Sequence, residues 1–200
     1  MKEKKLIVLE GISGAGKSTN INILLNTRDD VDAVNIKISK LLENVEKTNR
    51  IDYSNTDYYL LLEMLKTIIF QDSQKEFVVW ERNYLSTLAH AYAMGVKTNN
   101  FSEYEKVLSW YETNINKNLI KPDAYIYIDI PLENSIKRIK QRNESVVNDV
   151  WIEKEYMKIC EKFKLDFIAE RENQVKMFYV DGTKEIRDVN KQIIEIIEKL

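Results

Sequence analysis

Cysteine is almost absent from this chain: among 200 residues only Cys160 carries a thiol, so no disulfide can form within it. That composition favours a reducing compartment, and we expect a cytoplasmic protein. Cys160 lies in a charged, helical-looking stretch without a motif around it, which favours a structural thiol over a nucleophile. Proline and glycine are also scarce, at two and five residues, and no linker or repeat divides the sequence. We therefore expect residues 1–200 to form one domain.

The sequence also lacks a long apolar run and a strong excess of one charge. The apolar residues after the basic N-terminal "MKEKK" stop at Glu10, far short of the roughly 18 residues that a membrane span needs. Thirty basic and 32 acidic side chains give a net charge of −2, which offers no broad attraction to nucleic acid or to an anionic membrane. We therefore expect neither a membrane nor a nucleic-acid partner.

Short β-rich runs alternate with longer helical patterns. The run at residues 5–10, "KLIVLE", is apolar and β-branched up to its last residue, which is typical of a strand buried on both faces. Similar runs follow at residues 33–38, 77–81, 124–130 and 175–180. Between them lie apolar stripes at helical spacing that we interpret as core, for example Tyr58, Leu61, Leu62, Leu65, Ile68 and Ile69. The alternation predicts a three-layer α/β/α fold in which helices cover both faces of a five-stranded parallel sheet.

A glycine-rich segment follows the first predicted strand, at the edge where such sheets bind their ligands. It reads "GISGAGKS": Gly11, four residues, then Gly16, Lys17 and Ser18, which is a complete phosphate-binding loop of the GxxxxGK[ST] type. Its glycines let successive N–H groups converge on phosphate oxygens at the positive end of the next helix. Lys17 is expected to reach the β- and γ-phosphates, and the Ser18 hydroxyl to bind Mg²⁺.

A second group of polar residues lies in "VVWERNYLSTLAHAYA" (residues 78–93). Glu81, at the end of a predicted strand, would lie beside the phosphate loop and hold Mg²⁺ or its water shell. Arg82 would offer a bidentate guanidinium to a phosphate or hydroxyl of a second substrate. The two residues could instead form an ordinary surface pair, but together with the upstream loop they favour an active site. No guanine-reading Asn-Lys-x-Asp sequence occurs, which argues against a GTPase.

Two arginines mark a third group, in "PDAYIYIDIPLENSIKRIKQRNES" (residues 122–145). Pro131 is expected to start a helix that carries Arg138 and Arg142 on one face. These arginines could neutralise charge on the transferred phosphoryl group, whereas a solvated basic helix face is the ordinary alternative. With the polar residues that follow, they predict a lid at about residues 138–150 that would exclude water during phosphoryl transfer.

In this order, the three groups resemble the thymidylate kinase and deoxynucleoside kinase branch of the P-loop kinases over nearly the whole chain. "VLEGISGAGKST" is similar to the strand and phosphate loop of that branch, and "ERNYLSTLAHAY" to its Asp-Arg-Tyr or Glu-Arg-Ser segment. "KPDAYIYIDIPLENSIKRIKQR" and "FYVDGTKEIRDVNKQI" are similar to the segment before the lid and to the last strand and helix. The resemblance implies ATP and Mg²⁺ as cofactors, a nucleotide or nucleoside as acceptor, and the homodimer that such kinases often form.

The resemblance also implies roles for individual residues. Phosphate binding is expected from the loop residues Gly11, Ser13, Gly14, Ala15, Gly16, Lys17, Ser18 and Thr19. Glu81 is expected to position the metal or the phosphates, Arg82 to contact the acceptor, and Arg138 and Arg142 to stabilise charge from the lid. The adenine is expected to border on Asp181, Gly182 and Thr183.

The chain departs from the thymidylate kinase pattern where the acceptor is read. Ser13 stands where thymidylate kinases usually carry an aspartate, and Glu63, one turn after Tyr59, stands where they place an arginine against the base. Tyr59 and His90 are the residues that we consider for contacts with the acceptor, with core positions as the alternative. The sequence thus predicts a kinase that phosphorylates a nucleoside monophosphate. A deoxynucleoside kinase acting on a 5′-hydroxyl and a nucleotide-switched binding protein are the alternatives.

Overall fold

The protein forms one parallel sheet surrounded by helices; the computed structural model describes residues 3–34, 56–115, 117–142 and 153–200. The strands are β1 (Lys5–Glu10), β2 (Val31–Ala33), β3 (Phe77–Glu81), β4 (Ala124–Asp129) and β5 (Lys176–Asp181). The helices of this part of the chain are α1 (Lys17–Thr27), α3 (Thr56–Asp72), α4 (Tyr84–Thr98), α5 (Ser102–Asn114), α6 (Leu132–Arg142), α7 (Lys154–Arg171) and α8 (Ile186–Ile197). The strand order is β2-β3-β1-β4-β5, and every pairing is parallel. The predicted α/β fold is confirmed.

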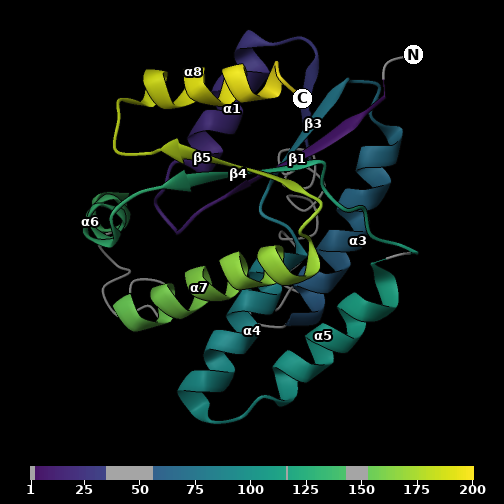
Figure 1. Ribbon diagram of the computed structural model, residues 1–200, viewed down its shortest axis with the longest axis vertical. Coiled ribbons are helices and arrows are strands. Elements are labelled where there is room, and N and C mark those ends of the chain that lie inside the picture. Colours follow the sequence, from purple (N-terminus) through teal and green to yellow (C-terminus); the bar gives the residue numbers. More distant parts are fainter. Residues whose placement is uncertain (1–2, 35–55, 116, 143–152) are drawn as a thin grey trace, which may run out of the picture.

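The helices cover the sheet in two layers (Figure 1). α1 and α8 lie on one face, and α3, α4, α5 and α7 lie on the other, while α6 stands at the end toward which β4 and β5 point. Side chains of β1 alternate between the two layers: Ile7 and Leu9 pack on the side of α1 and α8, and Leu6 and Val8 on the other side. By the same alternation, Glu10 at the end of β1 faces the layer that contains α7.

Four of the predicted strands coincide with observed ones to within one residue at each end. The second prediction, residues 33–38, is different: β2 ends at Ala33, and residues 35–38 lie outside the described part of the chain. The expectation that β5 is buried on both faces is wrong. β5 is an edge strand of the sheet, and Tyr179 is 61% exposed.

The apolar stripe predicted on α3 is core only in part. Leu61 and Ile68 are 57% and 59% exposed, whereas Leu60 is buried together with Glu63 and Lys66. The two polar residues tolerate burial because they form an ion pair of 2.5 Å one turn apart. The helix therefore turns a partly polar face inward and leaves two large apolar side chains at the surface.

Among the described residues, no helix is long and apolar enough to cross a membrane.

The predicted lid at residues 138–150 is described only at its start. α6 ends at Arg142, and the residues after it, together with the Arg142 side chain, lie outside the described part.

Candidate active site

The phosphate loop joins β1 to α1 and has a backbone that suits glycine. Gly11, Gly14 and Gly16 have φ values of 134°, 78° and 97°. A Cβ atom on Gly11 would lie 2.5 Å from the carbonyl oxygen of Ile128 in β4, so the loop packs closely on the sheet. The first turn of α1 has neither a side-chain cap nor an acidic residue. Its N–H groups are therefore left for an anionic ligand.

Lys17 lies across its own loop. Its Nζ donates hydrogen bonds to the carbonyl oxygens of Gly11 at 3.0 Å and Ile12 at 2.9 Å, and the residue is only 3% exposed. Burial lowers the pKa of Lys17 well below its usual range, and the nearby charge of Arg82 lowers it further, while Glu81 acts in the opposite direction. A desolvated cation of this kind is stabilised by a polyphosphate, which is the ligand that the motif predicts.

The remaining loop residues are divided between packed and exposed positions. Ala15 is buried, and the carbonyl oxygen of Ser13 accepts a hydrogen bond from the Ser135 hydroxyl of α6. Ser18 and Thr19 are exposed on the first turn of α1. Their hydroxyls are therefore accessible to a metal ion or to phosphate oxygens.

The end of β3 brings Glu81 and Arg82 beside the phosphate loop. Leu9 of β1 is the register partner of Glu81, and the N–H of Arg82 donates to the carbonyl oxygen of Leu9 at 3.1 Å. Arg82 has a φ of 61°, a left-handed conformation that is uncommon for residues with a side chain. Its Nη1 lies 3.2 Å from Ser86 Oγ and 3.7 Å from Glu10 Oε2. The guanidinium is thus held at the carboxyl ends of two central strands.

The turn at Arg82 is also held from α3. Lys66 Nζ donates to the carbonyl oxygen of Arg82 at 3.2 Å, and it lies 5.7 Å from the centre of the Trp80 ring. Burial raises the pKa of Glu63, the ion-pair partner of Lys66, although Lys66 opposes this effect. Tyr59 precedes Glu63 by one turn and is 41% exposed. It therefore shares the face of α3 that supports Arg82.

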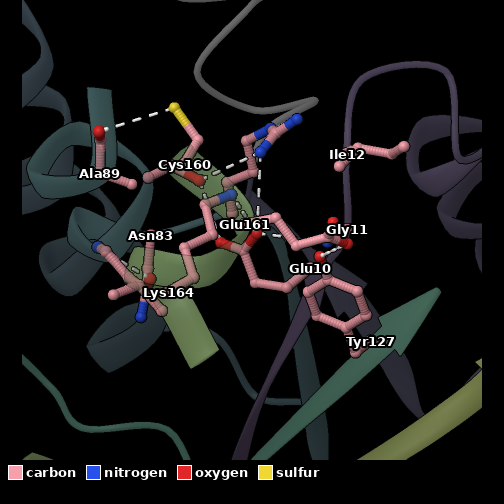
Figure 2. Close-up of polar contacts among 12 residues, drawn as sticks. Glu10, Gly11, Ile12, Asn83, Ala89, Tyr127, Cys160, Glu161 and Lys164 are labelled. Carbon is pink, nitrogen blue, oxygen red and sulfur yellow. Dashed lines mark hydrogen bonds and ion pairs between the residues drawn. The ribbon is translucent and has the colours of Figure 1, made fainter. Parts of the chain in front are cut away.

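Glu10 connects the loop, α4 and α7. It is fully buried, with an exposed fraction of 0%; its Oε2 accepts from Lys164 Nζ at 2.8 Å, and its Oε1 accepts from Ser86 Oγ at 3.0 Å. Figure 2 shows Lys164 extending from α7 toward Glu10 at the end of β1. Burial by itself would raise the pKa of Glu10, but the charges of Lys164 and Arg82 outweigh it and lower the pKa to about 2. The carboxylate is therefore ionised near neutral pH.

Sequence reasoning missed Glu10, Ser86 and Lys164 as parts of this site. The sequence pattern could have indicated Glu10, because a carboxylate ends an otherwise apolar strand directly before the phosphate loop. It could not have indicated Lys164, which is one of several lysines on α7, and only packing shows which of them is buried.

Arg138 joins two loops that are expected to contact the nucleotide. Its Nη1 donates to the carbonyl oxygen of Gly14 at 3.4 Å, and its Nη2 donates to that of Gly182 at 3.0 Å. At the end of β5, Asp181 accepts hydrogen bonds from the hydroxyl and the N–H of Thr183, which lower the pKa of Asp181. The structure thus brings together the phosphate loop, the first lid arginine and the residues predicted at the adenine.

The other predicted contacts are located only in part. Arg142 is the last residue of α6, and its side chain is outside the described residues. His90 of α4 pairs through Nδ1 with the Tyr156 hydroxyl of α7, and burial lowers the pKa of His90. Because His90 follows Ser86 by one turn, it lies on the face of α4 that contacts Glu10.

A phosphate loop on the first strand of a parallel sheet, with an acid and an arginine at the end of the neighbouring strand, defines the class of P-loop kinases. The sequence matches the thymidylate kinase family over residues 9–193, and the chain belongs to that family. It is 26% identical to the probable thymidylate kinase 1 of Saccharolobus solfataricus, with 98% of each chain covered. It is 28% identical to the thymidylate kinase of Thermosipho melanesiensis, with 97% of this chain and 98% of that protein covered.

Solved structures show the same fold. The deoxyadenosine kinase from M. mycoides, with dCMP and a flexible dCDP bound, has a TM-score of 0.71 at 19% identity over 98% of this chain and 100% of its own. The thymidylate kinase from Candida albicans has a TM-score of 0.64 at 19% identity, over 98% and 92% of the two chains. The predicted branch of the P-loop kinases and the predicted enzyme class, a P-loop kinase phosphotransferase, are confirmed.

Proposed function

We propose that the protein transfers the γ-phosphate of ATP to the phosphate of a nucleoside monophosphate, with Mg²⁺ as cofactor. The observation that carries this proposal is the position of Arg82. Its left-handed backbone holds a guanidinium at the ends of β1 and β3, beside the phosphate loop. A guanidinium in such a place can bind an acceptor phosphate through two parallel hydrogen bonds.

The loop fits a triphosphate and a magnesium ion. The glycine conformations and the uncapped first turn of α1 suit phosphate oxygens. The Ser18 hydroxyl is exposed at that turn, and the charge of Glu81 acts on Lys17 within the same site. Ser18 and Glu81 would supply the oxygen ligands that Mg²⁺ prefers. Bound there, the ion would offset negative charge on the phosphate oxygens.

The side chains of the site then work by positioning and charge neutralisation. Lys17 would exchange its two carbonyl partners for oxygens of the donor phosphates. Arg82 would orient the acceptor so that one of its phosphate oxygens attacks the γ-phosphorus while ADP leaves. Arg138 would keep the phosphate loop and the turn at Gly182 together around the donor. A phosphate acceptor is already anionic, so this reaction needs little help from a general base.

The experiment that tests the proposal measures ADP formation from Mg-ATP with a panel of nucleoside monophosphates and nucleosides. We expect one or more monophosphates to stimulate turnover, and Lys17→Ala to abolish it. Stimulation by nucleosides alone would identify a kinase that acts on a 5′-hydroxyl. If no acceptor stimulates turnover and ATP instead changes the affinity for a protein partner, the protein is a nucleotide-switched binding protein and the kinase proposal fails.

We also infer a homodimer. Leu61 and Ile68 are seven residues apart, on one side of α3, and both are more than half exposed. Exposed apolar pairs of this kind support a contact with a second copy of the chain. Light scattering should give the mass of a dimer for the protein and that of a monomer for the double variant Leu61→Lys/Ile68→Lys. A monomeric unmodified protein would overturn this inference without affecting the kinase proposal.

A further inference from the structure

We propose that Lys164 is a positioning residue: by binding Glu10 it keeps Arg82 available to the acceptor phosphate. The inference rests on the proposed function, because it takes Arg82 as the ligand of the acceptor. Lys164 lies on α7, far along the chain from Glu10, and its role is to occupy a carboxylate that would otherwise capture the arginine.

The distances around Glu10 show which cation it binds. Lys164 Nζ lies 2.8 Å from Glu10 Oε2, a full hydrogen bond, whereas Arg82 Nη1 lies 3.7 Å from the same oxygen. The second oxygen, Oε1, accepts from Ser86 Oγ at 3.0 Å, and the N–H of Gly11 donates to Oε2 at 3.3 Å. An arginine beside a carboxylate ordinarily closes into a bidentate pair. Here the partners of Glu10 are arranged so that Arg82 does not close onto it.

The exposed fractions of Lys164 and Arg82 also indicate that Lys164 is the fixed partner of Glu10. The side chain of Lys164 is 6% exposed and that of Glu10 is 0% exposed, so loss of Glu10 would leave Lys164 as a buried charge without this partner. Loss of Lys164 would leave Arg82, 3.7 Å away, as the cation beside Glu10. The Arg82 side chain is 27% exposed and can turn toward a ligand. Burial lowers the pKa of Lys164, and the charge of Glu10 opposes that effect. Lys164 is thus the fixed partner of Glu10, and Arg82 is the adaptable one.

The charge balance explains why a third cation is needed. Glu10 and Glu81 act on Lys17 as anions, and Arg82 and Lys164 act on it as cations. When all five side chains are ionised they carry three positive and two negative charges, which leaves one net positive charge for an incoming phosphate. Without Lys164 the set is neutral, and Glu10 would draw Arg82 onto itself. If Arg82 were paired with Glu10 for about nine-tenths of the time, its apparent affinity for the acceptor would fall about tenfold.

The test uses Lys164→Met, which keeps an unbranched side chain one atom shorter than lysine and removes its charge. Initial rates are measured with Mg-ATP and with whichever of dTMP, dCMP, dAMP and dGMP the unmodified protein phosphorylates fastest. We expect the KM for that acceptor to rise about tenfold, with the KM for ATP and kcat within about twofold, because only acceptor binding is weakened. Lys164→Arg should restore most of the acceptor affinity. Lys162→Met, which removes an exposed lysine on the same helix, is the matched control and should change nothing.

A second pair of variants separates positioning from general structure. In a Glu10→Gln background the carboxylate at the end of β1 no longer competes for Arg82, so adding Lys164→Met should leave the acceptor KM as it is in Glu10→Gln alone. The same tenfold rise in that background would overturn the proposal, and so would an unchanged acceptor KM in folded Lys164→Met. If Lys164→Met does not fold, Lys164→Gln takes its place, since it keeps a donor for Glu10 while losing the charge.

The outcomes distinguish this inference from the function on which it rests. If the unmodified protein uses no acceptor, the proposed function fails and the role of Lys164 falls with it. If the unmodified protein phosphorylates an acceptor but the Lys164 variants bind that acceptor as it does, only the role of Lys164 is wrong.

Discussion

Arg138 and Gly182 are joined by a hydrogen bond of 3.0 Å from the guanidinium to the carbonyl oxygen, and the same guanidinium reaches the carbonyl oxygen of Gly14 at 3.4 Å. One side chain of α6 therefore connects the phosphate loop with the turn after β5. The sequence predicted this arginine as a source of charge for the transferred phosphoryl group. Its contacts support a role in shaping the donor site.

Replacing Arg138 by methionine should therefore weaken ATP binding more than acceptor binding. The variant loses two hydrogen bonds from a charged donor, each worth about 1 kcal/mol or more, so the KM for ATP should rise at least about tenfold. Lys140→Met, at an exposed position of the same helix, is the matched control. Steady-state kinetics with each substrate varied in turn would show the effect. A rise confined to the acceptor KM would contradict this role.

The fold and the phosphate loop could be predicted because their signals are local. Continuous apolar runs predicted the bounds of β1, β3 and β4 to within one residue, and the GxxxxGK[ST] motif predicted the position of Lys17 in the phosphate loop. The inward face of α3 could not be predicted, because the buried pair Glu63 and Lys66 is stable only through contacts made by the folded chain. The role of Lys164 could not be predicted for the same reason, because its partner Glu10 is separated from it by most of the sequence.

Gly11→Ala should disable the phosphate loop, and Gly16→Ala should be milder. Both glycines have positive φ values, so either substitution strains the backbone by about 1 to 3 kcal/mol. Only at Gly11 would the new Cβ also lie 2.5 Å from a backbone oxygen of β4; at Gly16 its nearest neighbour, a side-chain atom, is 3.6 Å away. ATP binding by calorimetry and the midpoint of urea unfolding should both fall further for Gly11→Ala. Equal effects of the two variants would show that packing on β4 does not shape the loop.

Glu10 should make the stability of the protein sensitive to acid. Its pKa is about 2 in the folded protein against an ordinary value of 4.5, so the unfolded chain takes up the proton first. Its contribution to stability is therefore complete above about pH 5 and is lost as the pH falls toward about 2. At about 1.4 kcal/mol per pH unit, this contribution is on the order of 3 kcal/mol.

The measurement is the free energy of unfolding in urea at several pH values between about 7 and 2.5, for the protein and for Glu10→Gln. The difference between the two should be largest near neutral pH and should shrink as the solution becomes acidic. Parallel loss of stability in both proteins would mean that other carboxylates account for the acid sensitivity.

A buried hydrogen-bond network fixes the residues that follow Arg82. The Asn83 side chain caps α4 by accepting from the N–H of Leu85 at 3.1 Å, and its Nδ2 donates to the Tyr125 hydroxyl at 2.9 Å. That hydroxyl donates to Glu172 Oε2 at 2.6 Å, and the hydroxyl of Tyr84 donates to the other oxygen of Glu172. Burial raises the pKa of Tyr125 well above its usual range, so the hydroxyl stays protonated and serves as a donor. The cap of α4 is thus linked through β4 to the end of α7.

Tyr125→Phe should break this link, because it leaves Asn83 without an acceptor and Glu172 with one donor fewer in a buried environment. We expect a loss of about 1 to 3 kcal/mol in the free energy of unfolding, and a higher acceptor KM as the turn that holds Arg82 loosens. Tyr179→Phe is the control, since that hydroxyl is on an exposed side chain and, within the described residues, donates a hydrogen bond only to the Met177 sulfur, 3.6 Å away. Urea unfolding and acceptor kinetics on the same preparations would test both effects. A loss of stability with an unchanged acceptor KM would mean that the Arg82 turn is held by its bond to Leu9 and by Lys66 alone.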